Sequence, residues 1–400
     1  MTDEWFSRAR IERVKNLAYH GRKNKLKGAH LDIVIMIITA TICLGLLVFI
    51  HEGGHYLASR AFGVRVSEFM IGLPGPSIGF QHGETRFGVT CIPLGGYAKV
   101  CGMEPGEMSP HLEAAMASVY ARGEAVMEEV AADCGISADD AYEALEELTE
   151  WGSVVGPNKK DQFNTYRTPR VRPTGRDMRR ARKAGLPAPV AYEQGQARPL
   201  EDAHAFFESE YKQQYRSLPF WKRAVILLAG IFVNLLFAIL AFVLIYSILG
   251  IDVQNTETGE IRHVALEPLR AIYVGFIYIG MVVQAVVGLF NPYTVADTVS
   301  NSTSIMGIAV LSKSAFEQGF ESFLSFTAML SVSLGIMNLI PIPPLDGGRF
   351  VVELWARIRR KVVSPKALNR LSIVGMTLFM LLFVVMMSQD VQRYVFGNWG

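Results

Sequence analysis

The chain has 400 residues, of which half are hydrophobic, and its mean hydropathy of +0.25 is higher than that of ordinary soluble domains. The net charge is only +2, so the charge balance identifies no class of partner. The four cysteines show neither a CxxC spacing nor a paired framework, which excludes a small disulfide-stabilised fold, and we expect all four to be reduced.

Four hydrophobic runs are long enough to cross, or nearly cross, a lipid bilayer. They cover residues 31–50, 224–249, 323–340 and 371–387. The first run is too long for the hydrophobic region of a signal peptide, and no small-residue cleavage site follows it. A fifth run, 271–290, is interrupted by glycines and Gln284, and we expect it to form a helix on the membrane surface. The sequence therefore predicts a polytopic α-helical membrane protein with about four transmembrane helices.

The distribution of lysine and arginine predicts the topology. These residues are concentrated in 56–223 and 349–370 and are sparse in 250–322. The positive-inside rule places the first two regions in the cytoplasm and the third outside, which agrees with four crossings. The basic N-terminal arm, 1–30, disagrees, because the same rule would place it inside. Three explanations stay open: the arm is forced outward, it folds back along the surface, or the true start lies downstream.

The first hydrophobic run leads directly into the pentapeptide HEGGH, which spans His51 to His55. Residues four apart share one face of a helix, so the two imidazoles can bind one metal ion. Glu52 can then act as general base on a metal-bound water. Ionisable side chains are costly at this depth of a membrane and are usually functional. The alternative is a pair of interfacial histidines with a glutamate that extends to the membrane surface.

The third hydrophobic run ends in the segment 338–349, NLIPIPPLDGGR. A catalytic zinc with two histidine ligands lacks one protein ligand, and Asp346 is the one carboxylate of this segment at the depth of the histidines. Prolines at this depth are tolerated where the backbone is buried or lines a wet cavity. If 271–290 crossed the membrane, Asp346 and the histidines would lie on opposite sides, which is why we expect four crossings. An ordinary helix end is the alternative, but it would not account for Asp346.

These two motifs resemble those of the site-2 protease family, the intramembrane zinc metalloproteases. Three further segments resemble parts of the RseP-like bacterial group of that family. The segments are 69–80, 92–99 and 220–234, and the whole resemblance covers about 31–103 and 218–388. The resemblance implies that His51, His55 and Asp346 bind Zn²⁺ and that Glu52 activates water. It also implies hydrolysis of peptide bonds within or near the membrane.

The chain departs from the family pattern in two places. Ile231 occupies the position of the usual proline in the second span. Only about twenty polar residues, 251–270, lie where the RseP-like group carries PDZ domains, too few for such a domain. We therefore expect no selection of substrates by PDZ domains.

The substrate implied by the resemblance is a membrane protein with an unwound transmembrane segment. Short β-prone runs within 63–103 predict a small sheet, whose exposed edge can capture such a strand. A packing hairpin in the cytoplasm is the alternative. Asn338 can form a hydrogen bond with the substrate backbone. Five residues are predicted to contact the substrate. They are Asn338, Pro341, Pro343, Gly95 and Gly96.

The insert between the first two spans is not explained by the resemblance. Its first part, 104–166, is acidic, and its helix signals, with a cap at Ser137, predict a winged-helix-like unit. Acidic side chains repel phosphates, so we expect no nucleic acid, and either a protein partner or a spacer role is open. The second part, 167–217, is predicted to be a basic and polar linker. The stretch from Arg167 to Lys183 is expected to be disordered, in contact with anionic lipid, the acidic insert or solvent.

The predicted organisation has seven parts. They are a basic arm, 1–30; the first transmembrane helix with HEGGH and a membrane-associated β segment, 31–103; the acidic insert, 104–166; the linker, 167–217; the second transmembrane helix, 218–250; an extracytoplasmic segment with an amphipathic or apolar helix, 251–322; and the third and fourth transmembrane helices, 323–400.

We expect a multi-pass zinc protease of the inner (cytoplasmic) membrane of the cell, with its active site near the cytoplasmic side. It would act in regulated intramembrane proteolysis, for example on an anti-sigma factor, or on signal-peptide remnants. The alternative is a membrane-anchored interaction protein with a vestigial zinc site that acts through the insert.

Overall fold

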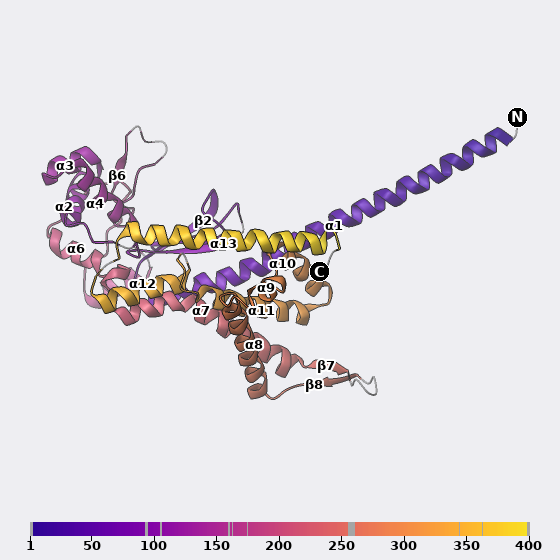
Figure 1. Cartoon of the computed structure of the whole chain (residues 1–400). Coiled ribbons are helices and arrows are strands. Elements are labelled where there is room, and N and C mark those ends of the chain that lie inside the picture. The colour runs from indigo at the N-terminus through magenta and orange to yellow at the C-terminus, as the bar shows by residue number, and fades with distance from the viewer. Residues whose placement is uncertain are drawn as a thin grey trace. The chain divides into compact units, whose positions relative to one another are not determined.

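The computed structural model is mostly helical, and Figure 1 shows its elements in chain order. It describes residues 3–92, 95–104, 106–158, 161, 163–173, 175–254, 261–343, 345–361 and 363–397, with the backbone alone for 3–30. The predicted basic arm, 1–30, therefore lies outside the residues whose side chains are described.

Five helices of the described chain are long and apolar enough to cross a membrane, by length and composition. They are α1 (Asp3–Ala61, apolar from Leu31), α7 (Phe220–Val243, continued by a π-helical segment, Leu244–Leu249), α8 (Pro268–Gly288), α11 (Phe320–Asn338) and α13 (Pro365–Tyr394). Four of them correspond to the predicted spans, and α11 ends two residues before the end of the predicted run 323–340. The fifth, α8, covers the run that we expected on the membrane surface, and its 21 residues are also long enough to cross. The chain is a multi-pass helical membrane protein.

The chain divides into two compact units. The first contains residues 1–46, 238–330 and 380–400, and the second contains 47–237 and 331–379. The helices α1, α7, α11 and α13 contribute to both units, and α8 belongs to the first. HEGGH, the insert and Asp346 all belong to the second unit.

The first unit contains α8, the hairpin of β7 (Ile251–Gln254) and β8 (Ile261–Val264), and the helices α9 (Val295–Ser300) and α10 (Ile305–Glu317). The helix α10 begins where the hydroxyl of Ser304 accepts a hydrogen bond from the amide of Met306. The buried Asp390 of α13 accepts hydrogen bonds from the amides of Ser304 and Gly307 at the same end. A carboxylate at a helix N-terminus is stabilised by the free N–H groups and the helix dipole.

A four-stranded sheet follows α1 in the second unit. Its strands are β1 (Val66–Ile71), β2 (Ser77–His82), β3 (Thr85–Thr90) and β4 (Gly96–Val100). The strand order is β2-β3-β1-β4, with β1 parallel to β3 and antiparallel to β4. The predicted small sheet is confirmed. Within the described strands, β4 pairs with β1 alone, so it is an edge strand.

The insert forms a helical domain with its own core. Its elements are α2 (Leu112–Arg122), β5 (Glu124–Val126), α3 (Met127–Cys134), α4 (Ala138–Glu150) and β6 (Thr165–Arg167). Figure 1 shows α2, α3 and α4 side by side, and their buried residues surround Trp151. The predicted cap is confirmed, because the hydroxyl of Ser137 accepts a hydrogen bond from the amide of Asp140.

The region 167–217 differs from the predicted linker. Arginine, methionine and alanine are good helix formers, and they form the helix α5 (Gly175–Ala184) in the stretch expected to be disordered. A second helix, α6 (Ala203–Tyr211), buries Phe207 against Trp151 in the core of the insert. The prediction of a linker was therefore wrong for this helix, because its aromatic side chains complete the hydrophobic core of the preceding domain.

Candidate metal centre

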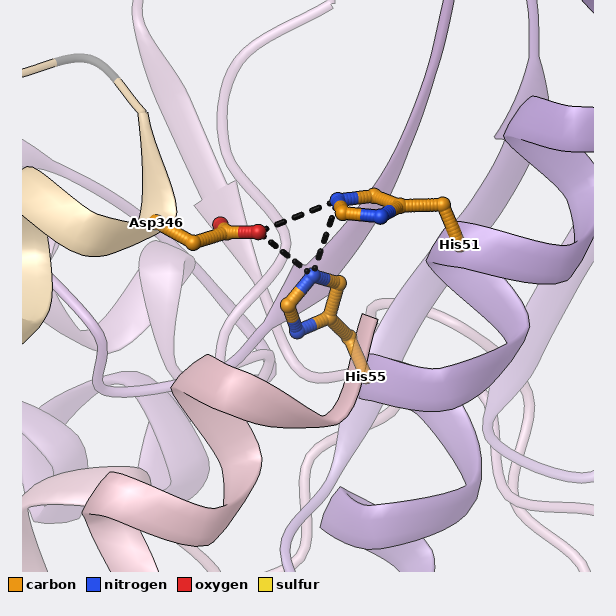
Figure 2. Close-up of side chains that lie close together, drawn as sticks. All are labelled: His51, His55 and Asp346. Atoms are coloured by element: carbon orange, nitrogen blue, oxygen red, sulfur yellow. Dashed lines mark hydrogen bonds and ion pairs between the residues drawn. The ribbon is translucent and has the colours of Figure 1, made fainter. Parts of the chain in front are cut away.

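Two histidines of α1 and an aspartate of α12 (Asp346–Arg359) converge at one point (Figure 2). The Oδ2 atom of Asp346 lies 3.0 Å from Nε2 of His51 and 3.2 Å from Nε2 of His55. The two Nε2 atoms are 3.4 Å apart. Tetrahedral zinc with bonds of about 2.0–2.1 Å separates its ligand atoms by about 3.3 Å. The three atoms therefore fit three corners of a zinc tetrahedron.

Local structure explains why these residues meet. His51 and His55 are four residues apart on α1, so their rings lie on one face. Asp346 is the first residue of α12, which begins directly after the predicted proline-rich segment. An ionised carboxylate is the form that binds metal.

Two groups on α7 hold the imidazole rings. Nδ1 of His55 lies 2.8 Å from the carbonyl oxygen of Ile226, which accepts its proton and leaves Nε2 free for a metal. Nδ1 of His51 lies 3.2 Å from the amide nitrogen of Asn234, whose Oδ1 has no partner. Rotating this amide by 180° would let Oδ1 accept the proton of Nδ1 and would leave Nε2 of His51 free for a metal, so we assign that orientation.

Sequence reasoning missed Asn234 as a partner of the metal site. The signal was present, because Asn234 is a polar residue within an apolar helix, and its side chain is fully buried. The carbonyl of Ile226 gave no signal, since any residue would supply it. Both contacts depend on how α7 packs against α1.

Two glycines allow α1 and α7 to approach each other. A Cβ atom on Gly230 would lie 2.4 Å from Nε2 of His55 and 2.8 Å from Cε1 of His51. A Cβ atom on Gly54 would lie 2.6 Å from the carbonyl oxygen of Ala229. Both distances are shorter than van der Waals contact. A side chain at Gly230 would therefore fill the space beside the two imidazoles.

Glu52 connects the metal centre to the edge strand β4. Its Oε2 accepts a hydrogen bond of 2.9 Å from the backbone amide of Ala98. This contact fixes one oxygen of the carboxylate on the unpaired side of β4. The other oxygen, Oε1, has no hydrogen bond among the described residues.

A cavity of about 1120 Å³ opens at the metal centre. Its lining includes Glu52, His55 and Asp346, and also parts of β4, the insert and α12. Of the predicted substrate contacts, Gly96 and Pro343 line this cavity. Gly95, Asn338 and Pro341 are not in the lining. The amide of Asn338 donates to the carbonyl of Leu334 in its own helix, and Pro341 is exposed.

Known proteins resemble this chain over most of its length. The sequence profile of peptidase family M50 matches residues 39–382. The zinc metalloprotease RasP of Oceanobacillus iheyensis is 24% identical, over 89% of this chain and 99% of its own length. The RasP proteins of Geobacillus kaustophilus and Shouchella clausii are each 22% identical, over 90% and 87% of this chain and 98% and 96% of their own lengths. The family match covers more than half of the chain and includes all three residues of the metal centre, so this protein belongs to peptidase family M50.

Proposed function

We propose that this protein is an intramembrane zinc metalloprotease that hydrolyses peptide bonds in the transmembrane segments of membrane proteins. The observation that carries the proposal is the convergence of three ligand atoms, with separations of 3.0–3.4 Å, beside a large cavity. Membership of family M50 and the similarity to proteins named zinc metalloprotease RasP support it.

His51, His55 and Asp346 would hold the zinc ion through Nε2, Nε2 and Oδ2. When bound, zinc acidifies a water molecule and polarises the scissile carbonyl. Glu52 is the general base: Oε2 is held by the amide of Ala98, and Oε1 accepts the proton of the attacking water. The same carboxylate then returns this proton to the leaving amine nitrogen.

The edge strand β4 would hold the substrate in an extended conformation. A helix hides its peptide bonds, so cleavage requires an unwound segment, and an unpaired strand edge can bind such a segment by β-augmentation. The strand β4 lines the cavity from Gly96 to Val100 and is hydrogen-bonded on its other side to β1. We propose that Gly95, Gly96, Asn338, Pro341 and Pro343 contact this segment.

The topology of four crossings, with α8 on the outer membrane surface and the active site near the cytoplasmic side of the inner membrane, is part of the proposal. Regulated proteolysis of an anti-sigma factor or removal of signal-peptide remnants is the expected role. The insert would act as a winged-helix-like domain, because α2, β5, α3, α4, the bridge residue Val155 and β6 follow in that order. Its acidic surface favours a protein partner over nucleic acid.

The substitution Glu52→Gln tests the mechanism. Purified full-length protein loaded with zinc should cleave a single-span model substrate, and Glu52→Gln should reduce kcat by about 10²- to 10⁴-fold with zinc content unchanged. Glu128→Gln is the matched control, because Glu128 is exposed on α3 and outside the cavity lining. Cleavage by Glu52→Gln at the wild-type rate would disprove the role of this carboxylate.

A further inference from the structure

The helix α12 has two different faces. One face lines the cavity from Asp346 through Arg349 and Glu353 to Arg357, with spacings of three or four residues, and Arg360 lines it directly after the helix. The other face exposes large apolar side chains. They are Val351, Trp355 and Ile358. The metal ligand, Arg349 and Arg357 therefore lie along one line of a single helix, and Arg360 is the residue that ends it.

The cations on this face lack anionic partners. Glu353 pairs with Arg223 at 3.0 Å, and Arg349 donates to the sulfur of Met103. The side chains of Arg357, Arg360 and the following Lys361 form no ion pair or hydrogen bond with any described residue. The far end of the cavity therefore carries uncompensated positive charge.

The acidic residues of the cavity do not cancel this charge. Glu150 accepts hydrogen bonds from the amides of Met103 and Glu104. Glu104 and Glu107 also line the cavity, but their side chains are exposed on the insert and form no ion pair with α12 among the described residues.

We propose that the cationic end of the cavity, formed by Arg349 and Arg357 of α12 and by Arg360 and Lys361 directly after it, is a specificity subsite for acidic side chains that flank the cleaved bond of the substrate. The inference rests on the proposed protease function and names a substrate feature that this site selects. Guanidinium groups bind carboxylates through two parallel hydrogen bonds, which suits them to this task.

The geometry of the helix predicts where the acidic residues lie. Arg357 follows Asp346 by eleven residues, which is about 16 Å at a helical rise of about 1.5 Å per residue. An extended peptide covers this distance with about five residues, at about 3.3 Å each. The subsite therefore selects aspartate or glutamate about five or six positions from the cleaved bond.

The position of the cations favours a peptide over a lipid headgroup as the occupant. Arg357 and Arg360 line the same cavity as Glu52 and Asp346. The cation that belongs to the apolar face is Arg359, whose guanidinium lies 4.8 Å from the ring centroid of Trp355. A lipid headgroup would meet Arg359 and Trp355, because tryptophan and arginine anchor helices at membrane interfaces.

A pair of model substrates tests the subsite. Both are single-span peptides that are cleaved at the same bond. One carries Asp-Glu and the other Asn-Gln at the fifth and sixth positions from that bond. The pair is made once with these residues on the N-terminal side of the bond and once on the C-terminal side. The wild-type protein should cleave one acidic substrate with kcat/KM about five- to tenfold higher than its neutral counterpart, mainly through a lower KM. Arg357→Gln/Arg360→Gln should remove this preference, and Arg359→Gln should retain it.

Charge reversal gives a second, independent test. Arg357→Glu/Arg360→Glu should prefer a substrate with Lys-Lys at the same two positions, and raising the salt concentration should reduce both preferences. Equal zinc content across the variants shows that the metal centre has formed.

Several outcomes would overturn the subsite. Equal cleavage of the acidic and neutral substrates by wild-type protein would do so and would leave the protease function intact. The effect of the arginine substitutions could instead depend on the anionic lipid content of the vesicle and not on the charge of the substrate flank. That result would show that these arginines bind lipid. Absence of zinc-dependent cleavage of every substrate would instead contradict the proposed protease function.

Discussion

Two polar clusters in the second unit differ in how their charges are satisfied. In the metal-site cluster (His51, His55 and Asp346), two imidazole nitrogens crowd around a single carboxylate oxygen. In the insert joint (Arg65, Glu84 and Glu210), Arg65 donates to both oxygens of Glu210, at 2.7 and 3.0 Å, and also to Glu84. Donors and acceptors match in the joint, whereas three potential ligands converge in the metal site. A converging cluster indicates a binding site, and a matched cluster indicates a structural contact.

Removing one metal ligand should have the largest effect. His55→Ala leaves two ligand atoms, which cannot hold zinc in a tetrahedral site with one open position. We expect loss of stoichiometric zinc and a fall in activity on the order of 10³-fold or more. Zinc content by mass spectrometry and cleavage of the model substrate measure the two effects.

His82→Ala is the matched control for this substitution, because His82 is an exposed histidine at the end of β2 in the same unit. It should retain one zinc ion per chain. Full zinc occupancy in His55→Ala would show that the converging cluster is not the metal site.

Breaking the insert joint should affect stability rather than metal binding. Burial alone would raise the pKa of Glu210, but Arg65 holds it below its usual range, so Glu210 is ionised at neutral pH. Arg65→Gln would leave this carboxylate buried without its ion-pair partner. We expect the free energy of local unfolding of α6 to fall by about 3–5 kcal/mol. Hydrogen exchange of the α6 amides, followed by mass spectrometry, measures this change.

Arg60→Gln serves as the control for the joint. Arg60 pairs with the same Glu84 at 3.1 Å, but both side chains are about 40% exposed, so the loss should be below about 1 kcal/mol. The double substitution Arg65→Gln/Glu210→Gln should recover part of the stability, because it removes both charges. If Arg65→Gln changed hydrogen exchange no more than Arg60→Gln, the joint would not connect the insert to the segment that precedes β1.

The sequence was sufficient to predict the metal-site cluster because its residues carry local signals. HEGGH places two imidazoles on one helix face, and Asp346 is an acidic residue beside an apolar run. The long separation in sequence between HEGGH and Asp346 did not prevent the prediction, because the third ligand had to be a carboxylate at the same membrane depth as the histidines. Asn234 was missed because its role depends on the packing of α7 against α1, which no short motif records.

The insert joint could not be predicted, although the helices around it could. Arg65 and Glu210 are 145 residues apart, and neither belongs to a recognisable pattern. The helices α2, α3 and α4 were predicted from capping and helix propensity, which are local. The helix α6 was assigned to a linker because its contribution is tertiary: Phe207 completes a core that the preceding domain leaves open.

Asn234 allows a finer test of the metal-site cluster. Asn234→Ala would remove the partner of Nδ1 of His51, and loss of such an outer hydrogen bond lowers metal affinity by about 10- to 100-fold. Competition with a chelator measures the affinity. Asn234→Asp should restore it, because a carboxylate accepts the same proton.

Asn338→Ala is the control for Asn234, because the amide of Asn338 bonds its own helix and is outside the metal centre. It should leave zinc affinity unchanged and raise KM if Asn338 holds substrate as proposed. Equal losses of zinc affinity in both variants would indicate a general weakening of the fold instead of an oriented histidine.

The smallest expected effect concerns Glu150 of the insert, whose contribution to stability should depend on pH. Burial, together with the nearby Glu104, raises the pKa of Glu150 to about 6. Because this pKa is higher in the folded state than in the unfolded state, the stability that Glu150 contributes is full below about pH 4.3 and is lost as the pH rises through about 6. Glu150→Gln keeps an oxygen that accepts from the amides of Met103 and Glu104 but cannot ionise. It should therefore stabilise the insert by up to about 2 kcal/mol at pH 8 and by nothing at pH 4, measured as the shift in Tm.

The exposed Glu143→Gln should show no such dependence on pH. A shift that is the same at pH 4 and pH 8 would mean that Glu150 is satisfied as an anion, in the way that Glu210 is satisfied by Arg65.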